Sequence, residues 1–327
     1  MAGPRSCILK TRSMDKRLPL IAIIGPTAVG KTELAIQLAE RLGAELISAD
    51  SRLLYRGMDI GTAKPSRQDL ARVPHHLIDV ADPDETWSLA AFQRAAAEAV
   101  AAIHTRGKLA ILVGGTGQYL RSIFDGWAPP RLAAQPQLRA ALAAWAKELG
   151  GDELHRRLSV IDPLAANNID ARNVRRTLRA LEVTLVSGRR FSQQRRRAES
   201  PYRILQLGLS RPRPELYARI DARIQAMLQA GWLDEVKALL AKGYDPALPS
   251  LSAIGYAQII QHLSGELTLD QALTAIKRRT RILVRRQAAW FKPNDRQIRW
   301  LQAGDSKVLE NAGQIIEEFL ATKNKVI

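Results

Sequence analysis

The sequence predicts an α/β protein built on a parallel sheet, with an all-helical segment inserted into it. Short apolar runs alternate with helical patterns, and these runs end in polar or glycine-rich turns. The clearest runs are Leu18–Ile24 and Lys108–Val113. Between about residues 127 and 201 the strand signals stop and helical periods continue alone. Ligands of parallel sheets bind at the carboxyl ends of the strands, so we expect the functional residues in those turns.

The first half of the chain alternates strands with helices. Leu18–Ile24 is continuously apolar, as expected for a strand buried on both faces of a sheet. Gly43 ends the helical pattern that follows, and Ser88 suits the N-cap of a long alanine-rich helix closed by Gly107. In order, we expect the strand Leu18–Ile24, the helix Lys31–Leu42, the strand Ala44–Ala49, a short strand His76–Val80, a helix from Ser88 to about Thr105, and the strand Lys108–Val113.

The sheet is expected to resume after the helical segment. The apolar run Arg203–Leu209 predicts a further strand, and Pro293 stops a long helix that begins near Asp270. The remaining expected elements are helices around 214–230, 232–242 and 253–263, the long helix Asp270–Phe291, the strand Ile298–Leu301, and a terminal helix after Asp305.

We therefore predict three parts. Residues 1–17 form a disordered basic tail that lacks the apolar region of a secretory signal. Residues 18–126 and 202–327 form the core, and residues 127–201 form the inserted helical subdomain. One helix of this insert is expected to bury an apolar stripe and to carry arginines on its other side. The stripe is Val174, Leu178, Leu181 and Leu185, and the arginines are Arg172, Arg175, Arg176 and Arg179.

The charge balance indicates a polyanionic partner. Lys and Arg number 49 against 32 Asp and Glu, giving a net charge of +17 and a pI near 10.5. Such a field attracts nucleic acids or anionic membrane surfaces. No apolar run approaches the roughly 18 residues of a membrane span and no lipid anchor is evident, so nucleic acid is favoured over a membrane. The single cysteine, Cys7, excludes an intrachain disulfide and fits a reducing compartment such as the cytoplasm.

The strongest local motif follows the first strand. It is a complete G-x-x-x-x-G-K-[ST] pattern between an apolar strand and a helix, which predicts a phosphate-binding P-loop. Its backbone amides and the helix N-terminus bind phosphate oxygens, Lys31 adds a point charge, and the Thr32 hydroxyl suits Mg²⁺. The residues are Gly25, Pro26, Thr27, Ala28, Val29, Gly30, Lys31 and Thr32.

The carboxylate that usually accompanies this motif is not at its usual place. P-loop ATPases and GTPases end a later strand in a Mg²⁺-binding Asp, whereas Lys108–Val113 runs into Gly114-Gly115-Thr116-Gly117. These glycines either bring Thr116 to a substrate or only allow a close backbone approach. Asp50, at the end of the second strand, is a candidate for facing the group attached to the phosphates, although a loop anchor is the alternative.

Several motifs together resemble one family. The strings GPTAVGKT, ADSRLLYRGMDIGTAKP, PHHLID and LVGGTGQYL occur in order, followed by RALEV, AIGY and RRQAAWF. They are similar to the tRNA dimethylallyltransferases, also called tRNA isopentenyltransferases, of the bacterial type without a zinc finger. The resemblance covers about residues 20 to 300. It implies a P-loop NTPase-like core and transfer of a dimethylallyl group from dimethylallyl diphosphate to the exocyclic amine of the adenosine 3′ to the anticodon, with Mg²⁺.

The chemistry of such a transfer assigns roles to the residues above. Lys31, the loop amides, Thr32 and Mg²⁺ stabilise the leaving diphosphate. Asp50, with Thr116, positions the amine and accepts its proton as the C–N bond forms. By the resemblance, the diphosphate-contacting arginine corresponds to Arg223, for which a solvated helical arginine is the alternative.

The resemblance and the basic helical faces also imply a tRNA-binding set. Phosphate contacts and stacking hold an anticodon stem-loop on such surfaces. The set is Asp50, Ser51, Arg52, Leu53, Thr116, Arg139, Arg175, Arg176, Thr177, Leu178, Arg179, Ser252, Ala253, Ile254, Gly255, Tyr256, Arg285, Arg286, Gln287 and Trp290. Helix packing is the alternative role for Trp290, and a solvated face is the alternative for the arginines.

Some positions depart from the family pattern, and two other functions are considered. Leu53 stands where many members have Gln, Ala289 where Thr is common, and Ala257 where Lys or Arg is frequent, which weakens single tRNA contacts. The alternative enzyme is a small-molecule P-loop kinase, which has no need of a basic insert. The alternative without chemistry is a nucleotide-gated RNA-binding protein. A monomer is expected, since no coiled-coil pattern or exposed apolar stripe is evident.

Overall fold

The computed structural model describes residues 17–322 apart from 129, 131, 133–134, 195 and 198. The chain divides into two compact units, one made of the residues up to Leu120 and from Pro201, and the other of Arg121–Ser200. The expected tail at 1–17 lies almost wholly outside the described residues. The insert was expected at 127–201, so the structural division starts six residues earlier and ends one residue earlier.

The first unit is built on one six-stranded sheet. Its order is β3-β2-β4-β1-β7-β8, and every neighbouring pair is parallel. β1 lies in the centre, with Ile24 beside Gly114 on one side and Gly208 on the other. The strands are β1 Leu18–Ile24, β2 Glu45–Ser48, β3 His75–His76, β4 Ala110–Gly114, β7 Tyr202–Ser210 and β8 Ile298–Gln302. The predicted parallel α/β core is confirmed.

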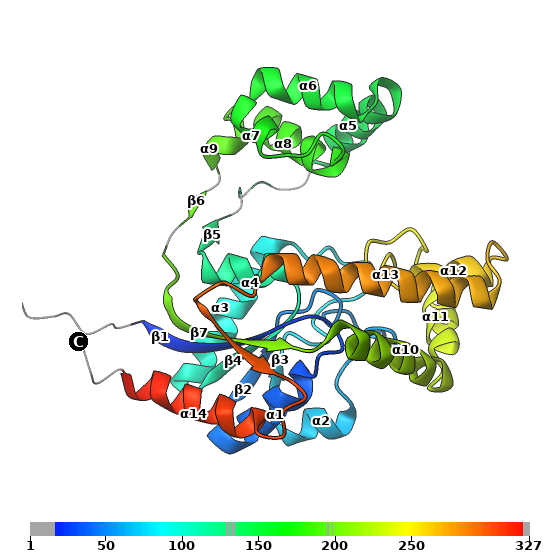
Figure 1. The fold of residues 1–327 in the computed structure, drawn as a ribbon. Helices are drawn as coiled ribbons and strands as arrows, with labels where there is room; N and C mark the ends of the chain where they lie inside the picture. Colours follow the sequence, from blue (N-terminus) through cyan, green and yellow to red (C-terminus); the bar gives the residue numbers. More distant parts are fainter. Residues whose placement is uncertain are drawn as a thin grey trace, which may run out of the picture. The chain divides into compact units, whose positions relative to one another are not determined.

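Helices cover both faces of this sheet (Figure 1). α1 and α14 pack together on one face, and α3 packs against β2 and β4 on the other. This arrangement follows from right-handed crossovers, because the chain moves outward from β1 to β3 and then returns to β4. The helices before the insert are α1 Lys31–Leu42, α2 Arg67–Arg72, α3 Leu89–Thr105 and α4 Gly117–Phe124.

Local sequence signals set these boundaries. Gly43 ends α1 in the left-handed region, with φ of 61°, where glycine is favoured. Ser88 caps α3, since its side chain accepts a hydrogen bond from the amide of Ala91. The third strand is shorter than expected and ends at His76, because Leu77 and Asp79 adopt positive φ and cannot extend it.

The remaining helices of the first unit follow β7. They are α10 Arg213–Gln229, α11 Trp232–Ala241, α12 Tyr256–Leu263, α13 Leu269–Trp290 and α14 Val308–Ala321. The long predicted helix near 270–291 is confirmed as α13, whose capping box pairs Thr268 with Gln271. None of the helices in the described part of the chain has both the length and the apolar character needed to cross a bilayer.

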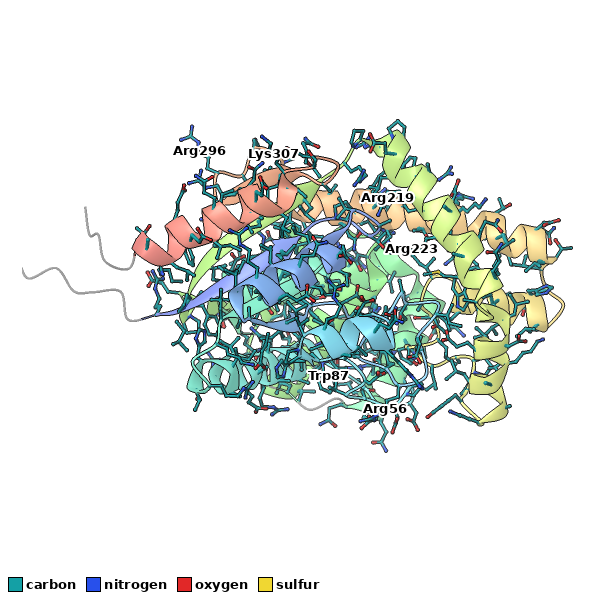
Figure 2. All side chains as sticks on the ribbon, turned by 90° about the horizontal axis from the view of Figure 1, so that it is seen from below. Arg56, Trp87, Arg219, Arg223, Arg296 and Lys307 are labelled. Carbon is teal, nitrogen blue, oxygen red and sulfur yellow. The ribbon has the colours of Figure 1, made fainter. Side chains whose placement is uncertain are left out.

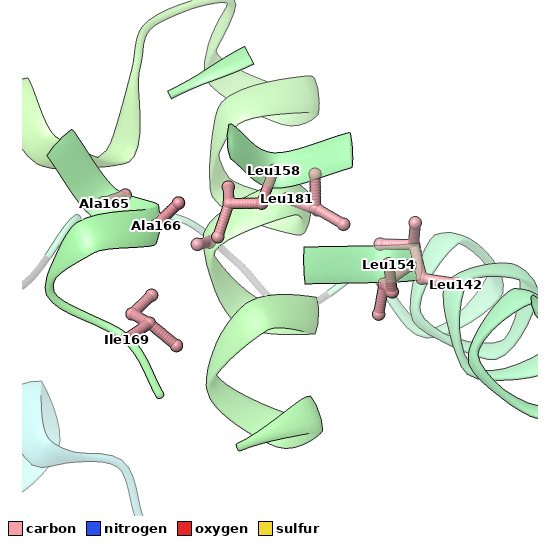
Figure 3. Packing of buried hydrophobic residues seen from close by; sticks show 8 residues of the cluster. Leu142, Leu154, Leu158, Ala165, Ala166, Ile169 and Leu181 are labelled. Carbon is pink, nitrogen blue, oxygen red and sulfur yellow. The ribbon is translucent and has the colours of Figure 1, made fainter. Parts of the chain in front are cut away.

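The second unit is mainly helical, as expected for the insert. Its elements are β5 Trp127–Ala128, α5 Pro136–Leu149, α6 Gly151–Ile161, α7 Pro163–Asn167, α8 Val174–Ser187, α9 Phe191–Gln194 and β6 Arg196–Arg197. β5 and β6 pair antiparallel, which brings together the two chain segments that enter and leave the helices. The core of the unit is small and aliphatic (Figure 3). It contains Leu142, Leu154, Leu158, Ala165, Ala166, Ile169, Ala180 and Leu181.

The predicted apolar stripe of α8 is only partly correct. Leu181 is buried, and Val174 and Leu178 pack against the core at its margin. Leu185, however, is 54% exposed. The buried face of α8 instead includes Thr177, Ala180 and Glu182. Polar side chains therefore occupy part of the face that was expected to be apolar.

Candidate active site

The P-loop connects the central strand β1 to α1. Ala28 and Gly30 have positive φ, of 63° and 115°, and Gly30 is the N-cap residue of α1. The chain therefore curls between Ile24 and Lys31 and brings backbone amides to the N-terminus of α1. This geometry suits the binding of an anion, which is the role that the sequence motif predicts.

Three cations surround the space above this loop. Lys31 donates from Nζ to the carbonyl oxygen of Pro26 at 2.7 Å, and Arg219 donates from Nε to the carbonyl oxygen of Ala28 at 2.9 Å. Arg223 is one helical turn from Arg219 on α10 (Figure 2), and all three side chains line one cavity. This cluster favours a highly charged anion such as a diphosphate.

Burial and mutual repulsion alter how these cations titrate. Burial lowers the pKa of Lys31 from 10.5 to about 8; Asp50 opposes this shift and Arg223 adds to it. Burial also lowers the pKa of Arg223, with a further contribution from the neighbouring charge of Arg219. Burial and mutual repulsion destabilise the charged forms of these groups, so an anion that binds between them is strongly stabilised by their charge.

The cavity extends beyond the phosphate loop. Its volume is about 270 Å³, near the lower limit for small-molecule sites. Asp50 and Ser48 line it from the end of β2. Its apolar wall includes Leu53, Ala63, Pro65 and Ile78. Leu53, a member of the predicted tRNA-binding set, thus lies in the same cavity as Asp50 and the phosphate loop.

Asp50 and Thr116 lie on adjoining loops at the ends of β2 and β4. One oxygen of Asp50, Oδ1, accepts a hydrogen bond from the Arg52 amide at 2.9 Å. The Thr116 hydroxyl oxygen accepts one from the Ser51 amide at 3.2 Å, and the Thr116 amide donates to the carbonyl oxygen of Ala49 at 3.3 Å. Asp50 and Thr116 are therefore connected through Ser51. The alternative role of Asp50, that of a loop anchor, accounts for Oδ1 but not for its second carboxylate oxygen.

The cavity offers a suitable donor set for Mg²⁺. Thr32, Ser48 and Asp50 all line it and carry oxygen donors, which a hard cation prefers. Over the residues that the structure describes, no three His, Cys, Asp or Glu side chains gather into a metal-binding group. A magnesium ion at Thr32 would therefore take most of its ligands from phosphate oxygens and water, as is usual for this ion.

Gln287 has a different position from the one expected. The prediction puts it on an RNA-facing surface, but its Oε1 accepts from the Thr27 amide at 2.8 Å and its Nε2 donates to the Gly115 carbonyl at 3.2 Å. Trp290 is 39% exposed and lies over Gly117, where an added Cβ would be 2.1 Å from its ring. The packing alternative for Trp290 is thus supported, while part of its ring remains accessible. Arg285 and Arg286 are exposed on the same helix.

The segment Ser252–Tyr256 mostly supports the neighbouring loops. Tyr256 is fully buried, donates to Glu235 at 2.6 Å, and has a pKa raised by burial and by that carboxylate. Trp232 packs so closely on Gly255 that an added Cβ would lie 1.9 Å from its ring. Ala253 is buried too. The residues of this segment that reach solvent are Ser252, which is exposed, and Ile254, which is partly exposed.

Arg52 is engaged by protein rather than free for RNA. Its Nη1 donates to the carbonyl oxygens of Pro249 and Ser250, at 2.9 and 3.1 Å. The side chain therefore joins the loop that follows Asp50 to the segment that precedes α12. Ser51, whose amide contacts Thr116, is partly exposed beside it.

The predicted RNA-binding arginines of the helical unit fall into two groups, one paired with a buried carboxylate and the other exposed to solvent. Arg139 and Arg179 both donate to Glu182, at 2.9 and 2.8 Å, and that residue is only 2% exposed. Thr177 is fully buried and donates to Asn173, so its side chain is not placed for contact with RNA. Arg175 and Arg176 reach solvent, and within the described residues their side chains have no hydrogen-bond or ion-pair partner.

Two residues of the site were not identified from the sequence. Arg219 lies four residues before Arg223, a spacing that puts both on one helix face and could have revealed it. Glu235 accepts hydrogen bonds from the amides of Asp59, Ile60 and Gly61, at 2.9, 2.7 and 3.2 Å. No sequence pattern marks Glu235, because three of its partners are backbone amides more than 170 residues away and the fourth is the Tyr256 hydroxyl.

Comparison with known proteins agrees with this geometry. The family model described as IPP transferase matches residues 53–294. A tRNA dimethylallyltransferase from Roseiflexus sp. (strain RS-1) is 50% identical over 305 residues, covering 93% of this chain and 99% of the relative. One from Thermomicrobium roseum is 45% identical over 307 residues, covering 94% and 93%.

Solved structures give the same result. A full-length tRNA isopentenylpyrophosphate transferase from Bacillus halodurans is 40% identical, with a TM-score of 0.70 over 93% of this chain and 97% of that chain. A eukaryotic dimethylallyltransferase acting on tRNA is 26% identical, with a TM-score of 0.80 over 93% of this chain and 80% of that chain. With a family match over most of its length and relatives at about half identity, the chain belongs to the IPP transferase family.

Proposed function

We propose that this protein transfers a dimethylallyl group from dimethylallyl diphosphate to the N6 amine of the adenosine 3′-adjacent to the anticodon in tRNA, releasing diphosphate. The general activity, prenylation of tRNA, follows from the family. The observation that supports the detailed reaction is a single cavity lined both by Lys31, Arg219 and Arg223 and by Asp50. The first group suits a leaving diphosphate, and the carboxylate suits an amine that loses a proton.

The proposed reaction is one substitution at the first carbon of the donor. The N6 lone pair forms the C–N bond while the C–O bond breaks, and the electron pair of that bond leaves with the diphosphate. The amine proton becomes acidic as nitrogen acquires positive charge, and it moves to a carboxylate oxygen of Asp50. The Thr116 hydroxyl oxygen accepts a hydrogen bond from the Ser51 amide of the same loop. Its proton is therefore available for a hydrogen bond to the adenine.

The diphosphate loop supplies electrostatic stabilisation of the leaving group. Loop amides and the cations of Lys31, Arg219 and Arg223 stabilise the negative charge that grows on the departing oxygen. A bound Mg²⁺ at Thr32 would neutralise further charge on the diphosphate. Because the cations already lie around the cavity, little reorganisation is needed during the reaction.

The exposed arginines support a role in binding RNA both for α8 of the helical unit and for α13 of the first unit. Arg175 and Arg176 on α8, and Arg285 and Arg286 on α13, present charge to solvent, as phosphate-contacting residues do. We propose that the unit expected at 127–201 binds the anticodon stem-loop and that the protein acts as a monomer in the cytoplasm. A small-molecule kinase is not favoured by the family, and the strand β4 ends in glycines rather than in a metal-binding Asp.

The direct test is analysis of the RNA product. Purified protein is incubated with unmodified tRNA, dimethylallyl diphosphate and Mg²⁺, and nuclease fragments of the tRNA are weighed by mass spectrometry. We expect one added C5H8 unit on the anticodon fragment that contains the adenosine 3′ to the anticodon. No mass increase, or ATP turnover without RNA, would overturn the proposal and favour RNA binding alone or a kinase.

A further inference from the structure

We infer that Gln287 is a positioning residue that holds the diphosphate loop at a fixed distance from the loop carrying Thr116. Its Oε1 accepts from the Thr27 amide at 2.8 Å, and its Nε2 donates to the Gly115 carbonyl at 3.2 Å. These partners are 260 and 172 residues away in the sequence. The inference rests on the proposed function, because it assigns the two loops to the leaving group and to the amine.

The contact requires an amide side chain. A backbone N–H only donates and a backbone carbonyl only accepts, so the two partners define which end of the Gln287 amide is oxygen. A carboxylate would accept from Thr27 but would oppose the Gly115 carbonyl with a second acceptor. A methionine of similar length would offer neither hydrogen bond at ordinary strength.

The surroundings accommodate this side chain closely. An added Cβ at Gly115 would lie 2.4 Å from Gln287 Nε2, and one at Gly117 would lie 2.1 Å from the Trp290 ring. Gln287 and Trp290 are three residues apart, so one face of α13 contacts the chain on both sides of Thr116. The glycines therefore permit the approach of α13, and the approach confines Thr116.

The clamp formed by Gln287 connects the ends of three strands. Thr27 belongs to the loop after β1, Gly115 and Thr116 to the loop after β4, and Thr116 contacts Ser51 and Ala49 after β2 at 3.2 and 3.3 Å. The leaving group is held by the first loop, and the amine by the other two. Reacting atoms must be held about 3–3.5 Å apart, and a displacement of about 1 Å costs roughly 100-fold in rate.

The same geometry predicts that Gln287 acts on the rate and not on binding. The Thr27 amide already donates to Gln287, so removal of the side chain takes no donor away from a phosphate. Lys31, Arg219 and Arg223 retain their positions around the cavity because none of them contacts Gln287 through a described hydrogen bond. We therefore expect a lower rate at saturation with nearly unchanged affinities.

The first experiment compares Gln287→Glu and Gln287→Met with the matched controls Gln229→Glu and Gln229→Met. Gln229 is the exposed last residue of α10. For both Gln287 variants we expect the single-turnover rate at saturating tRNA and donor to fall about 10- to 100-fold. The KM for tRNA and the Kd for inorganic diphosphate should stay within about threefold, and the Gln229 variants should match the parent protein.

The pH profile distinguishes positioning from a general loss of packing. A protonated carboxylic acid has one donor and one acceptor, so it reproduces the amide of Gln287. The rate of Gln287→Glu relative to the parent should therefore rise as the pH falls from 8 to about 5.5, since burial beside the Gly115 carbonyl raises the pKa of the new carboxyl group. The relative rate of Gln287→Met should stay constant over the same range.

Hydrogen exchange of the free protein provides a readout that does not need activity. The Thr27 amide should exchange faster in Gln287→Met than in Gln229→Met, together with the amides of residues 114–117. Unchanged exchange, or a saturated rate equal to the parent's in both Gln287 variants, would overturn the inference. An inactive parent protein would instead overturn the proposed function, and exchange would still decide whether the clamp exists.

Discussion

Arg179 donates a hydrogen bond at 2.8 Å to the carboxylate of Glu182, three residues further along α8, and Arg139 of α5 donates to the same group at 2.9 Å. Glu182 is almost fully buried, and although burial alone would raise its pKa, the two arginines hold the pKa below its ordinary value. A buried carboxylate is stable only when it is paired in this way. The arginines of α8 therefore do not form one uniform RNA-facing set.

The exposed pair, Arg175 and Arg176, carries the first prediction. Replacing both by Ala should weaken tRNA binding and flatten its dependence on the logarithm of salt concentration, by roughly one unit of slope for each phosphate that these arginines neutralise. The free energy of unfolding should hardly change, because neither side chain has a partner within the described residues. Binding titrations at a series of salt concentrations measure the slope, and an unchanged slope would mean that these arginines contact no phosphate.

Arg179 gives the opposite expectation. Arg179→Ala leaves Glu182 with Arg139 as its remaining cation, so the helical unit should lose about 1 to 2 kcal/mol of stability. Its effect on the salt dependence of tRNA binding should be smaller than that of Arg175→Ala. Urea unfolding of both variants makes this comparison directly. Equal stabilities with a large fall in the salt slope for Arg179→Ala would return this residue to the RNA-binding set.

The elements of the core could be predicted from the sequence because each signal is local. Leu18–Ile24 and Lys31–Leu42 have the predicted boundaries, since a strand, a glycine loop and a capped helix are encoded by adjacent residues. His75–His76 is shorter than the predicted strand, because positive φ at Leu77 ends it and no residue type in that segment predicts this. The helices α2 and α4 were not predicted from the sequence. Asp50 and Thr116 lie on adjoining loops, as expected for residues that follow neighbouring parallel strands of one sheet.

Side chains that serve distant backbone groups were harder to predict. Gln287 has the sequence context of a basic RNA-facing helix, yet both of its polar atoms contact loops more than 170 residues away. Tyr256 was expected to contact RNA, but its hydroxyl donates to Glu235, which in turn holds the amides of Asp59 to Gly61. Such contacts depend on the tertiary arrangement of several elements and leave no periodic signal in the chain.

Lys31 predicts how diphosphate binding depends on pH. Its pKa is lowered to about 8, mainly by burial, and a bound diphosphate raises it again by favouring the charged form. Below pH 8 the ammonium is already charged, so the affinity for inorganic diphosphate should be nearly constant. Above pH 8 binding must take up a proton, and the affinity should fall by up to about tenfold per pH unit.

Calorimetry of the parent protein and Lys31→Ala between about pH 7 and 9.5 tests this linkage. Lys31→Ala should bind diphosphate weakly and should lack the proton uptake above pH 8, while tRNA affinity should hardly change. A parallel loss of tRNA and diphosphate binding would mean that the loop is not a dedicated diphosphate site. Arg41→Ala, at an exposed position of the same helix α1, is the matched control.

Glu45 predicts the response of the core to acid. Its carboxylate accepts from Arg106 at 2.6 Å, contacts His76 and Lys108 at 2.7 and 3.1 Å, and has its pKa lowered from 4.5 to about 2, chiefly by the Arg106 hydrogen bond. A lowered folded-state pKa contributes stability that is present above about pH 4.5 and lost as the pH falls toward 2.

Glu45→Gln should therefore lower Tm by about 5 °C at pH 7 and make the remaining stability less sensitive to pH between 4.5 and 2.5. Thermal unfolding followed by circular dichroism at several pH values measures both effects. Glu33→Gln, at an exposed carboxylate on α1, serves as the control. Parallel acid profiles for Glu45→Gln and the parent protein would show that this ion cluster does not govern acid stability.

Asp50 carries the last prediction, because the proposed reaction depends on its second carboxylate oxygen. Oδ1 accepts from the Arg52 amide at 2.9 Å, and an amide oxygen at the same place can still accept that hydrogen bond. Asp50→Asn should therefore preserve the loop and its connection to Thr116, but it cannot take the amine proton. Loss of a positioned general base costs about 10²- to 10⁴-fold in rate, or about 3 to 5 kcal/mol in the barrier.

The expected pattern is a large fall in the single-turnover rate with nearly unchanged affinities for tRNA and for inorganic diphosphate. Asp50→Ala is the matched comparison, since it also removes the acceptor for Arg52 and should disturb the loop in addition to the chemistry. Full activity in Asp50→Asn would show that Asp50 orients the base and that water takes the proton. Loss of diphosphate binding alone, restored by raising the Mg²⁺ concentration, would instead assign Asp50 to the metal, because a carboxylate that only accepts a proton does not change how tightly the diphosphate is held.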